Sequence, residues 1–339
     1  MNIMNRSWLG SVLLFSGSAG AQAATFCVNT PAQLATALTT AQDNGEDDVI
    51  YLEVGTYSLS SELVYFAASD ETYKLAIIGG LTPGCSSGYA SSGNTILDGQ
   101  NAVRPLSITA AGEVDLGRIT FEHGNPAMYY GGALSLVNDS AADTYVFSSQ
   151  FISNKTASGN AGGAIYLSTS ANGDAFVWSN LFIANTSSGG AAIYLYGNGG
   201  TYVTGNTIVA NQLFNHTGLG AVDLTGTGTV WVTNNILWNN DGYDIYDQAG
   251  LTHYANNDIG VMGGFTAQSA SNNLSVDPDF NGFLSVSLAP ESPLVNAGLD
   301  TAPGGVGGCC DPDGHARVQG KHVDIGAYES DVLFRNGYQ

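Results

Sequence analysis

An internal repeat constrains the fold of this chain more than any other feature of its sequence. Each unit ends in a short apolar segment closed by asparagine. The copies begin at positions 149, 180, 206 and 235, which are 31, 26 and 29 residues apart. A glycine-led apolar strand lies upstream of each copy, at residues 131–136, 162–167, 190–195 and 220–224. Two patterns that keep the same order over four units indicate a repeat protein.

The size of one unit predicts how the units are arranged. Each strand has about four to six residues and alternates apolar with polar side chains, as half-buried strands do. A unit this small cannot bury its inward face alone, so successive units must stack into parallel sheets. We therefore predict an all-β, right-handed parallel β-helix. Its inward column contains Phe151, Phe182, Ile208 and Leu237.

Asparagine recurs at the end of every unit, at positions 154, 185, 211 and 240. In a stacked solenoid these side chains fall into one column, where each amide donates to the next and satisfies the backbone of the turn. We interpret Asn154, Asn185, Asn211 and Asn240 as a structural ladder rather than as catalytic residues.

The two ends of the repeat region differ from its middle. Residues 31–41 have apolar side chains at helical spacing, and Thr30 is placed to cap them, so we expect an N-terminal helix that covers the first sheet edge. From residue 277 the chain is rich in loops, with several Pro and Gly residues. The expected organisation is a signal peptide at 1–23, a capped β-helix at 24–276 and a loop-rich C-terminal module at 277–339.

The first 23 residues have the pattern of an export signal. Arg6 precedes a short apolar run at residues 8–15, and Ala21-Gln22-Ala23 matches a small-x-small cleavage site. No later segment reaches the roughly 18 apolar residues of a membrane-spanning helix. We expect a protein that is secreted or exposed on the outer cell surface, without a transmembrane span.

The charge balance narrows the range of partners. The chain has eight Lys and Arg residues and 29 Asp and Glu residues, which gives a formal net charge of −21. Such a surface repels nucleic acid and acidic polysaccharide, and it suits cations or neutral glycans. Solubility alone also accounts for an acidic surface. The sequence carries no signal for an oligomeric state.

Four cysteines remain after the predicted cleavage: Cys27, Cys85, Cys309 and Cys310. In an oxidising compartment an even number favours disulfides over a metal site. We predict a Cys27–Cys85 bond at the N-terminal end. Cys309 and Cys310 remain open between a vicinal bridge and bonds to different partners.

The repeated elements resemble those of known families. Gly162-Gly-Ala-Ile165 and Phe151-Ile-Ser-Asn154 are similar to the repeats of polymorphic outer-membrane proteins and of secreted pectate-lyase-like β-helix proteins. Residues 292–298, 311–317 and 323–329 resemble the choice-of-anchor Q module of bacterial surface proteins. The resemblance implies a fold and an extracytoplasmic location. It implies little about activity, because this fold carries lyases, hydrolases, epimerases and adhesins.

An enzymatic function would need a suitable set of charged side chains. A polyuronate lyase needs clustered cations and a base, whereas the basic residues here are scattered along the chain. A glycoside hydrolase needs paired carboxylates, for which Asp223, Asp244 and Asp247 are the candidates. The alternative for these three is that they are solvated acids at turns.

Binding is better supported, by a set of aromatic residues. Tyr145, Phe176, Tyr202 and Trp231 share one position of the repeat, and their alternation with valines points them outward. Trp178 lies on the same face two residues after Phe176. We predict that these five residues bind a polysaccharide or cell-surface glycan, because aromatic rings stack on sugars. The alternatives are that the rings stack on one another or that a loop covers them.

Two segments contain calcium-type ligands. Asp277, Asp279 and Asn281 open like an EF-hand loop, but position 12 of that loop is Leu288. Asp311 and Asp313 form a second candidate pair, and ordinary Asx-turns account for both segments as well. No cofactor is required by the sequence, and the ion that these segments could hold is a structural calcium ion. His123 and His216 lie in turns, and we assign them no role.

The sequence therefore favours a secreted or cell-surface β-helix protein that binds glycans or another surface without catalysis. The alternative is a secreted polysaccharide lyase or glycoside hydrolase.

Overall fold

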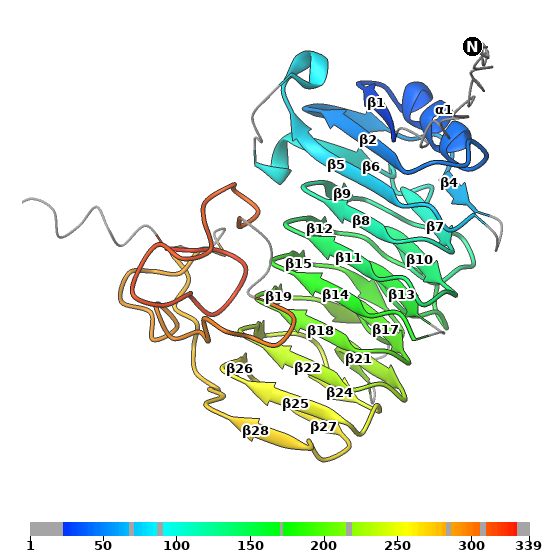
Figure 1. Ribbon diagram of the computed structural model, residues 1–339. Helices are drawn as coiled ribbons and strands as arrows, with labels where there is room; N and C mark the ends of the chain where they lie inside the picture. The colour runs from blue at the N-terminus through cyan, green and yellow to red at the C-terminus, as the bar shows by residue number, and fades with distance from the viewer. Residues whose placement is uncertain are drawn as a thin grey trace, which may run out of the picture.

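The computed structural model describes residues 23–67, 71–86, 91–169, 172–214, 219–282, 286–305 and 310–330. Within these ranges the chain winds into a right-handed parallel β-helix, as the repeat predicts (Figure 1). Three long sheets form its sides, here called sheets A, B and C, and every strand pair within them is parallel. The predicted signal peptide lies outside the described residues, except Ala23.

Sheet A has ten strands, in the order β1 (Ala24–Val28), β2 (Asp48–Glu53), β5 (Leu75–Leu81), β8 (Val114–Gly117), β11 (Thr144–Phe147), β14 (Ala175–Trp178), β18 (Thr201–Thr204), β22 (Val230–Thr233), β25 (Thr252–Ala255) and β28 (Ser269–Ser271). Sheet B has eight, which are β3 (Gly55–Ser58), β6 (Thr95–Asp98), β9 (Thr120–Glu122), β12 (Gln150–Ile152), β15 (Leu181–Ile183), β19 (Thr207–Val209), β23 (Ile236–Trp238) and β26 (Asp258–Ile259).

Sheet C also has eight strands, which are β4 (Leu63–Phe66), β7 (Leu106–Ala110), β10 (Leu134–Asn138), β13 (Ile165–Thr169), β17 (Ile193–Gly197), β21 (Gly220–Gly226), β24 (Tyr243–Asp247) and β27 (Met262–Gly264). A short pair joins β16 (Thr186–Ser187) to β20 (Gln212–Leu213). The helices among the described residues are α1 (Pro31–Ala41) and two 3-10 turns, η1 (Pro83–Cys85) and η2 (Ser92–Asn94).

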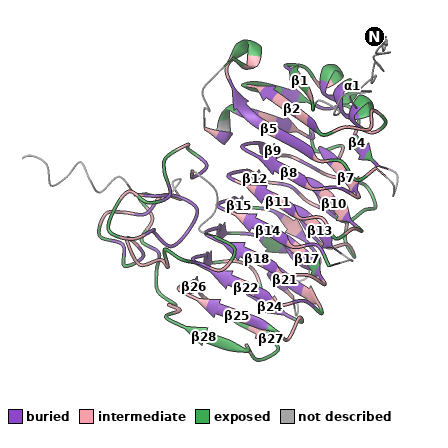
Figure 2. Cartoon of the chain, in the orientation of Figure 1, coloured by how far each residue is buried: buried purple, intermediate pink, exposed green. Residues whose placement is uncertain are grey.

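The interior of the solenoid consists of stacked like residues. Phe151, Phe182, Ile208 and Leu237 occupy one inward column with no exposed surface, which confirms the predicted register. The Phe151 ring stacks on Phe182 with a centroid distance of 4.8 Å. The valines that alternate with the aromatic residues of sheet A are buried too, and Figure 2 shows buried residues along the middle strands of this sheet.

The predicted asparagine ladder is present at the turn after sheet B. Asn154 Nδ2 donates to Asn185 Oδ1 at 3.0 Å, and Asn185 and Asn211 continue the chain of bonds to Asn240. A second ladder, which the sequence reasoning did not anticipate, lies between sheets A and B; it consists of Asn180, Asn206, Asn235, Asn257 and Asn273. The turns on both sides of sheet B are therefore held by buried amides.

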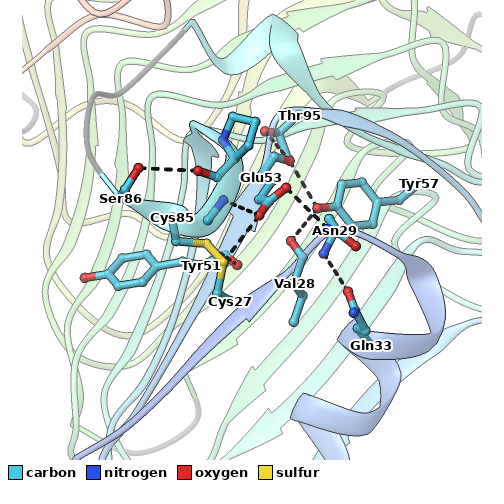
Figure 3. Close-up of a disulfide and its surroundings, with 12 residues drawn as sticks. Cys27, Val28, Asn29, Gln33, Tyr51, Glu53, Tyr57, Cys85, Ser86 and Thr95 are labelled. Atoms are coloured by element: carbon cyan, nitrogen blue, oxygen red, sulfur yellow. Dashed lines mark hydrogen bonds between the residues drawn. A yellow bond between two sulfur atoms is a disulfide. The ribbon is translucent and has the colours of Figure 1, made fainter.

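The N-terminal end is closed as predicted. Helix α1 begins after Thr30, whose hydroxyl accepts a hydrogen bond from Gln33 N at 3.3 Å, and it buries Leu34 and Leu38 against the first rungs. The Cys27–Cys85 disulfide joins β1 to η1, with its Cα atoms 5.9 Å apart (Figure 3). Glu53 lies beside this bond and accepts from Gly84 N at 2.6 Å. No free cysteine occurs among the described residues, and Cys309 lies outside them.

The described residues after Ser271 contain neither helix nor named strand, and they fold back along the solenoid beside sheet B (Figure 1). Leu294 and Ile325 pack on Val209 and Ile236, and Ala327 N donates to Thr207 Oγ1 at 2.9 Å. Inside this segment Arg317 is buried against Glu329, with 3.3 Å between Nη1 and Oε1. The C-terminal residues therefore cover part of one solenoid face.

Among the described residues, no helix is both long and apolar enough to cross a membrane.

Candidate functional site

The predicted aromatic column lies on the outer face of sheet A. Parallel pairing aligns Tyr145, Phe176, Tyr202 and Trp231 from β11 to β22, and His253 continues the column on β25. Tyr145, Tyr202 and Trp231 are half-buried, as is Trp178 beside the column, whereas Phe176 is 9% exposed. We call these five predicted residues the sheet-A aromatic face.

The rings of this face stack mainly on each other. The ring centroids of Tyr145 and Phe176 are 4.5 Å apart and their planes are nearly parallel, and the centroids of Phe176 and Tyr202 are 4.7 Å apart. Their faces are therefore turned toward their neighbours along the solenoid axis. Trp178 meets the first two rings at angles of 62° and 64°, so its plane runs across the stack. Trp231 stacks separately on His253 at 4.1 Å.

The C-terminal segment reaches one edge of the sheet-A aromatic face. Gly304 packs so closely on Tyr202 that a Cβ atom there would lie 2.6 Å from the ring. Nearby, Ser148 Oγ donates to Cys310 O at 2.8 Å. The indole N–H of Trp178 is buried and has no hydrogen-bond partner among the described residues. The aromatic face is therefore covered on one side by this chain.

Carboxylates border the exposed side of the rings. The Tyr145 hydroxyl donates to Asp143 Oδ2 at 3.3 Å, and Asp174 Oδ1 accepts from Gly200 N at the next rung. Burial and the charge of Asp143 raise the pKa of Tyr145 to about 12, so its hydroxyl keeps its proton at physiological pH. Lys74 also lies at this end of sheet A, where it pairs with Asp115 and Glu113.

A second column of rings, which the sequence reasoning missed, lies outside sheet C. Tyr130 stacks on Tyr166 at 5.1 Å between centroids, and Tyr166 stacks on Tyr194 at 5.7 Å. The three rings line a cavity of about 280 Å³ together with Asn160 and Ser188. The sequence signal was available, because Tyr166 and Tyr194 occupy the same position of the glycine-led strand.

Asp223, a catalytic candidate, occupies the outward position of β21 in register with Tyr194, yet it has no exposed surface. Its Oδ1 accepts from Gly220 N at 2.9 Å, and Oδ2 has no partner among the described residues. Burial raises the pKa of Asp223 to about 7. The alternative that Asp223 is a solvated turn acid is therefore wrong.

Asp244 and Asp247 are buried as well, so that alternative is wrong for them too. Asp244 accepts from Asn240 Nδ2 at 2.7 Å and from Val261 N at 2.8 Å. Asp247 accepts from Ala249 N and from the Tyr254 hydroxyl. These carboxylates act as hydrogen-bond acceptors for the solenoid, and none presents the solvent-facing pair that a glycosidase uses.

The calcium candidates fall into two places. Asp277 and Asp279 are exposed, and Asp277 Oδ1 accepts from Asp279 N in an Asx-turn. Asn281 does not join them; it lines a cavity of about 300 Å³ together with Asp311 and Asp313. Asp311 Oδ1 is engaged by the backbone amides of Asp313 and His315. A structural calcium ion at either place stays a prediction.

A cluster of metal-ligand type occurs where no role was expected. Asp98 at the end of β6 and Glu122 at the end of β9 are register partners, and His123 follows Glu122. His123 Nδ1 lies 3.2 Å from Asp98 Oδ1 and 3.9 Å from Glu122 Oε1, and one ligand atom of each residue lies within 4.8 Å of the others. Strand pairing brings these residues together across 25 positions, which is why the sequence alone did not reveal them. His216 lies outside the described residues.

Comparison with known proteins gives one family. A family model described as NosD, periplasmic copper-binding protein, matches residues 66–267. Neither the curated proteins nor the solved structures contain a match to the chain. The matched range covers most of the solenoid and includes the sheet-A aromatic face and the Asp98–Glu122–His123 cluster.

Proposed function

Because the chain belongs to the NosD family, we propose that it is an exported β-helix protein that binds a neutral glycan through the sheet-A aromatic face. The observation that carries the proposal is the set of half-exposed rings bordered by carboxylates on one flat sheet. Tyr145, Trp178, Tyr202 and Trp231 supply the rings, and Asp143 and Asp174 border them.

The ring geometry defines how a sugar chain would contact this face. Since Tyr145, Phe176 and Tyr202 bury their faces on each other, they offer ring edges and tyrosine hydroxyl groups outward. Trp178 lies across the edges of that stack. A glycan lying along the solenoid axis would pack its apolar C–H groups on the indole and place its hydroxyl groups near the phenols and carboxylates.

Charge supports a neutral ligand rather than an acidic one. Lys74, the cation at this end of the sheet, is held by two carboxylates at 2.6 Å and 2.5 Å. A polyuronate would meet Asp143 and Asp174 without a paired cation, and repulsion between like charges disfavours that contact.

The test is a polysaccharide pull-down with purified wild type and Trp231→Ala. Insoluble neutral glycans, such as cellulose, xylan and mannan, are compared with polygalacturonate. We expect retention on at least one neutral glycan, at least a tenfold loss in Trp231→Ala, and only a small change in melting temperature, because Trp231 is half-buried on the outer face.

The same incubations separate binding from catalysis. Reducing ends and unsaturated products are measured in the supernatant after prolonged incubation. Robust release of either would replace the binding function with that of a hydrolase or lyase. Equal retention of wild type and Trp231→Ala would remove the aromatic face from the site.

Copper is a second candidate ligand, favoured by the donor set of Asp98, Glu122 and His123. One imidazole and two carboxylates form a nitrogen and oxygen set, which suits Cu(II), and Cu(I) prefers sulfur ligands. We propose that these three residues would hold Cu(II) at the turn after sheet B. A divalent ion there would balance the negative charge of the two carboxylates.

Cu(II) titration followed by calorimetry and electron paramagnetic resonance tests the copper proposal. We expect one site with nitrogen coupling that is lost in His123→Ala. His322→Ala is the matched control, because His322 pairs with a single carboxylate, Asp300, at 2.8 Å. Identical titrations of wild type and His123→Ala would exclude the cluster as the copper site.

A further inference from the structure

Two adjoining cavities lie beside sheet B, the first at the turn that follows it and the second over its outer face, away from both sites described above. The first has a volume of about 620 Å³ and the second of about 580 Å³. Ala210 and Asn239 line both cavities, so the two adjoin at these residues. We call the two cavities together the sheet-B groove.

The floor of the second cavity is an apolar column. Ile183, Val209 and Trp238 are register partners on β15, β19 and β23 and point away from the solenoid core. The C-terminal segment packs on the neighbouring outward column, where Ile236 and Thr207 contact Ile325 and Ala327. Leu294 and Ile325 also pack on Val209, and Trp238 stays half-buried.

The walls come from parts of the chain that are far apart in sequence. Gln212, Asn239 and Asp241 border the first cavity, with Phe214 exposed at its rim. Asp277, Asp279 and Phe280 of the C-terminal segment close the second cavity. The second cavity therefore exists only when the C-terminal segment is docked on the solenoid, whereas no described residue of that segment lines the first.

Polar groups at the walls are available for a ligand. Gln212 and Asn239 are exposed at the walls of the first cavity. Asp279 is exposed too, beside the ring of Phe280. Amides and carboxylates of this kind bind hydroxyl groups through paired donors and acceptors.

The charge of the groove selects the ligand class. Among the described residues that line the two cavities there is no Lys, Arg or His. Three aspartates line them, Asp241 in the first and Asp277 and Asp279 in the second. Anionic sugars, phosphates and carboxylates are disfavoured there by repulsion. A purely apolar ligand would leave the wall amides and carboxylates desolvated without partners.

We propose that the sheet-B groove binds a soluble neutral oligosaccharide. The ligand stacks on Trp238 and Phe280, and its hydroxyl groups bond to Gln212, Asn239 and the wall carboxylates. Each cavity alone has the volume of an ordinary small-ligand site. This site shares no residue with the sheet-A aromatic face, so it goes beyond the proposed function and does not depend on it.

Calorimetry with soluble hexasaccharides tests the groove. The probes are cellohexaose, xylohexaose, mannohexaose and maltohexaose, with hexagalacturonate as the anionic comparison. We expect wild type to bind at least one neutral probe and to bind hexagalacturonate at least tenfold more weakly.

Variants then locate the site. Trp238→Ala should weaken binding at least tenfold, and Phe66→Ala, a control at an exposed aromatic position outside both proposed sites, should leave it unchanged. Because Trp238 also packs on buried side chains, Gln212→Ala and Asn239→Gly provide a second measurement at exposed positions. Glycine suits residue 239, where φ is 56°.

The outcomes distinguish the two glycan proposals. Loss of soluble binding in Gln212→Ala and Asn239→Gly, with pull-down on insoluble glycan intact, supports the groove. Loss of soluble binding in Trp231→Ala alone would assign it to sheet A and overturn the groove. Absence of binding to all four neutral probes by wild type would overturn it as well, and it would leave the pull-down result untouched.

Discussion

Asn240 Nδ2 donates to Asp244 Oδ1 at 2.7 Å, so an aspartate ends the ladder that begins at Asn154. Inside the ladder every member both donates and accepts. Asp244 is the last acceptor, and its Oδ2 bonds to Val261 N on the next coil. The buried acid thus links the repeated part of the solenoid to its final rungs.

The ladder predicts a large effect from removing one amide. In Asn185→Ala, Asn154 loses the acceptor for both its N and Nδ2, and Phe151 O loses its donor. A buried polar group left unsatisfied costs about 1–3 kcal/mol. We therefore expect the free energy of unfolding, measured in urea, to fall by several kcal/mol. Asn281→Ala, at an exposed position, should change the free energy of unfolding little.

The inward column predicts a contrast between two aromatic residues. Phe182→Ala should destabilise the solenoid by about 3–5 kcal/mol, because the ring is fully buried between Phe151 and Ile208. Trp231→Ala should cost much less, because Trp231 is half-exposed on the outer face. Thermal unfolding of both variants measures the difference. A larger loss for Trp231 would contradict the assignment of inward and outward faces.

The disulfide at the N-terminal end should contribute measurably to the free energy of unfolding. Cys27–Cys85 closes a loop with a sequence separation of 58 residues. Replacing both cysteines by serine should lower the free energy of unfolding by about 2–4 kcal/mol. Non-reducing peptide mapping of the wild type should recover the Cys27–Cys85 peptide pair. A pair that joins either cysteine to Cys309 or Cys310 would refute the arrangement at this end.

Buried acids predict that mild acid stabilises the protein. Burial raises the pKa of Asp223 to about 7 and, together with the charges of Asp244 and Asp277, that of Asp258 to about 6. A raised folded-state pKa means that the folded protein holds protons that the unfolded chain has released. Stability is then greatest below the unfolded pKa near 4 and falls as pH rises toward 7.

Melting temperatures measured from pH 5 to pH 8 test this dependence. The wild type should melt at higher temperature at pH 5 than at pH 7.5, and the slope should be smaller in Asp223→Asn. Asp139→Asn removes an exposed charge and serves as the control for the general effect of net charge. Equal slopes in the two variants would show that Asp223 does not carry the effect.

The period of the repeat was sufficient to predict the elements along the solenoid. Units of nearly constant length can stack in register in one way, so the inward column from Phe151 to Leu237 and the ladder from Asn154 to Asn240 followed from alignment alone. The helix at residues 31–41 followed from its apolar spacing and from Thr30. The Cys27–Cys85 pairing is confirmed, but the reason for predicting it, that a solenoid keeps its two ends apart, is wrong here, because the C-terminal segment folds back and Pro312 contacts Ser92.

Other features depend on contacts that no local pattern encodes. The outward position of Asp223 was readable from the sequence, but its burial arises from the packing around that position. The Asp98–Glu122–His123 cluster depends on the pairing of β6 with β9. The second cavity of the sheet-B groove depends on where the C-terminal segment crosses the solenoid. Repetition determined the rungs, because identical units make identical neighbours; the non-repeating C-terminal segment has no such neighbour, so only the tertiary structure decided where it packs.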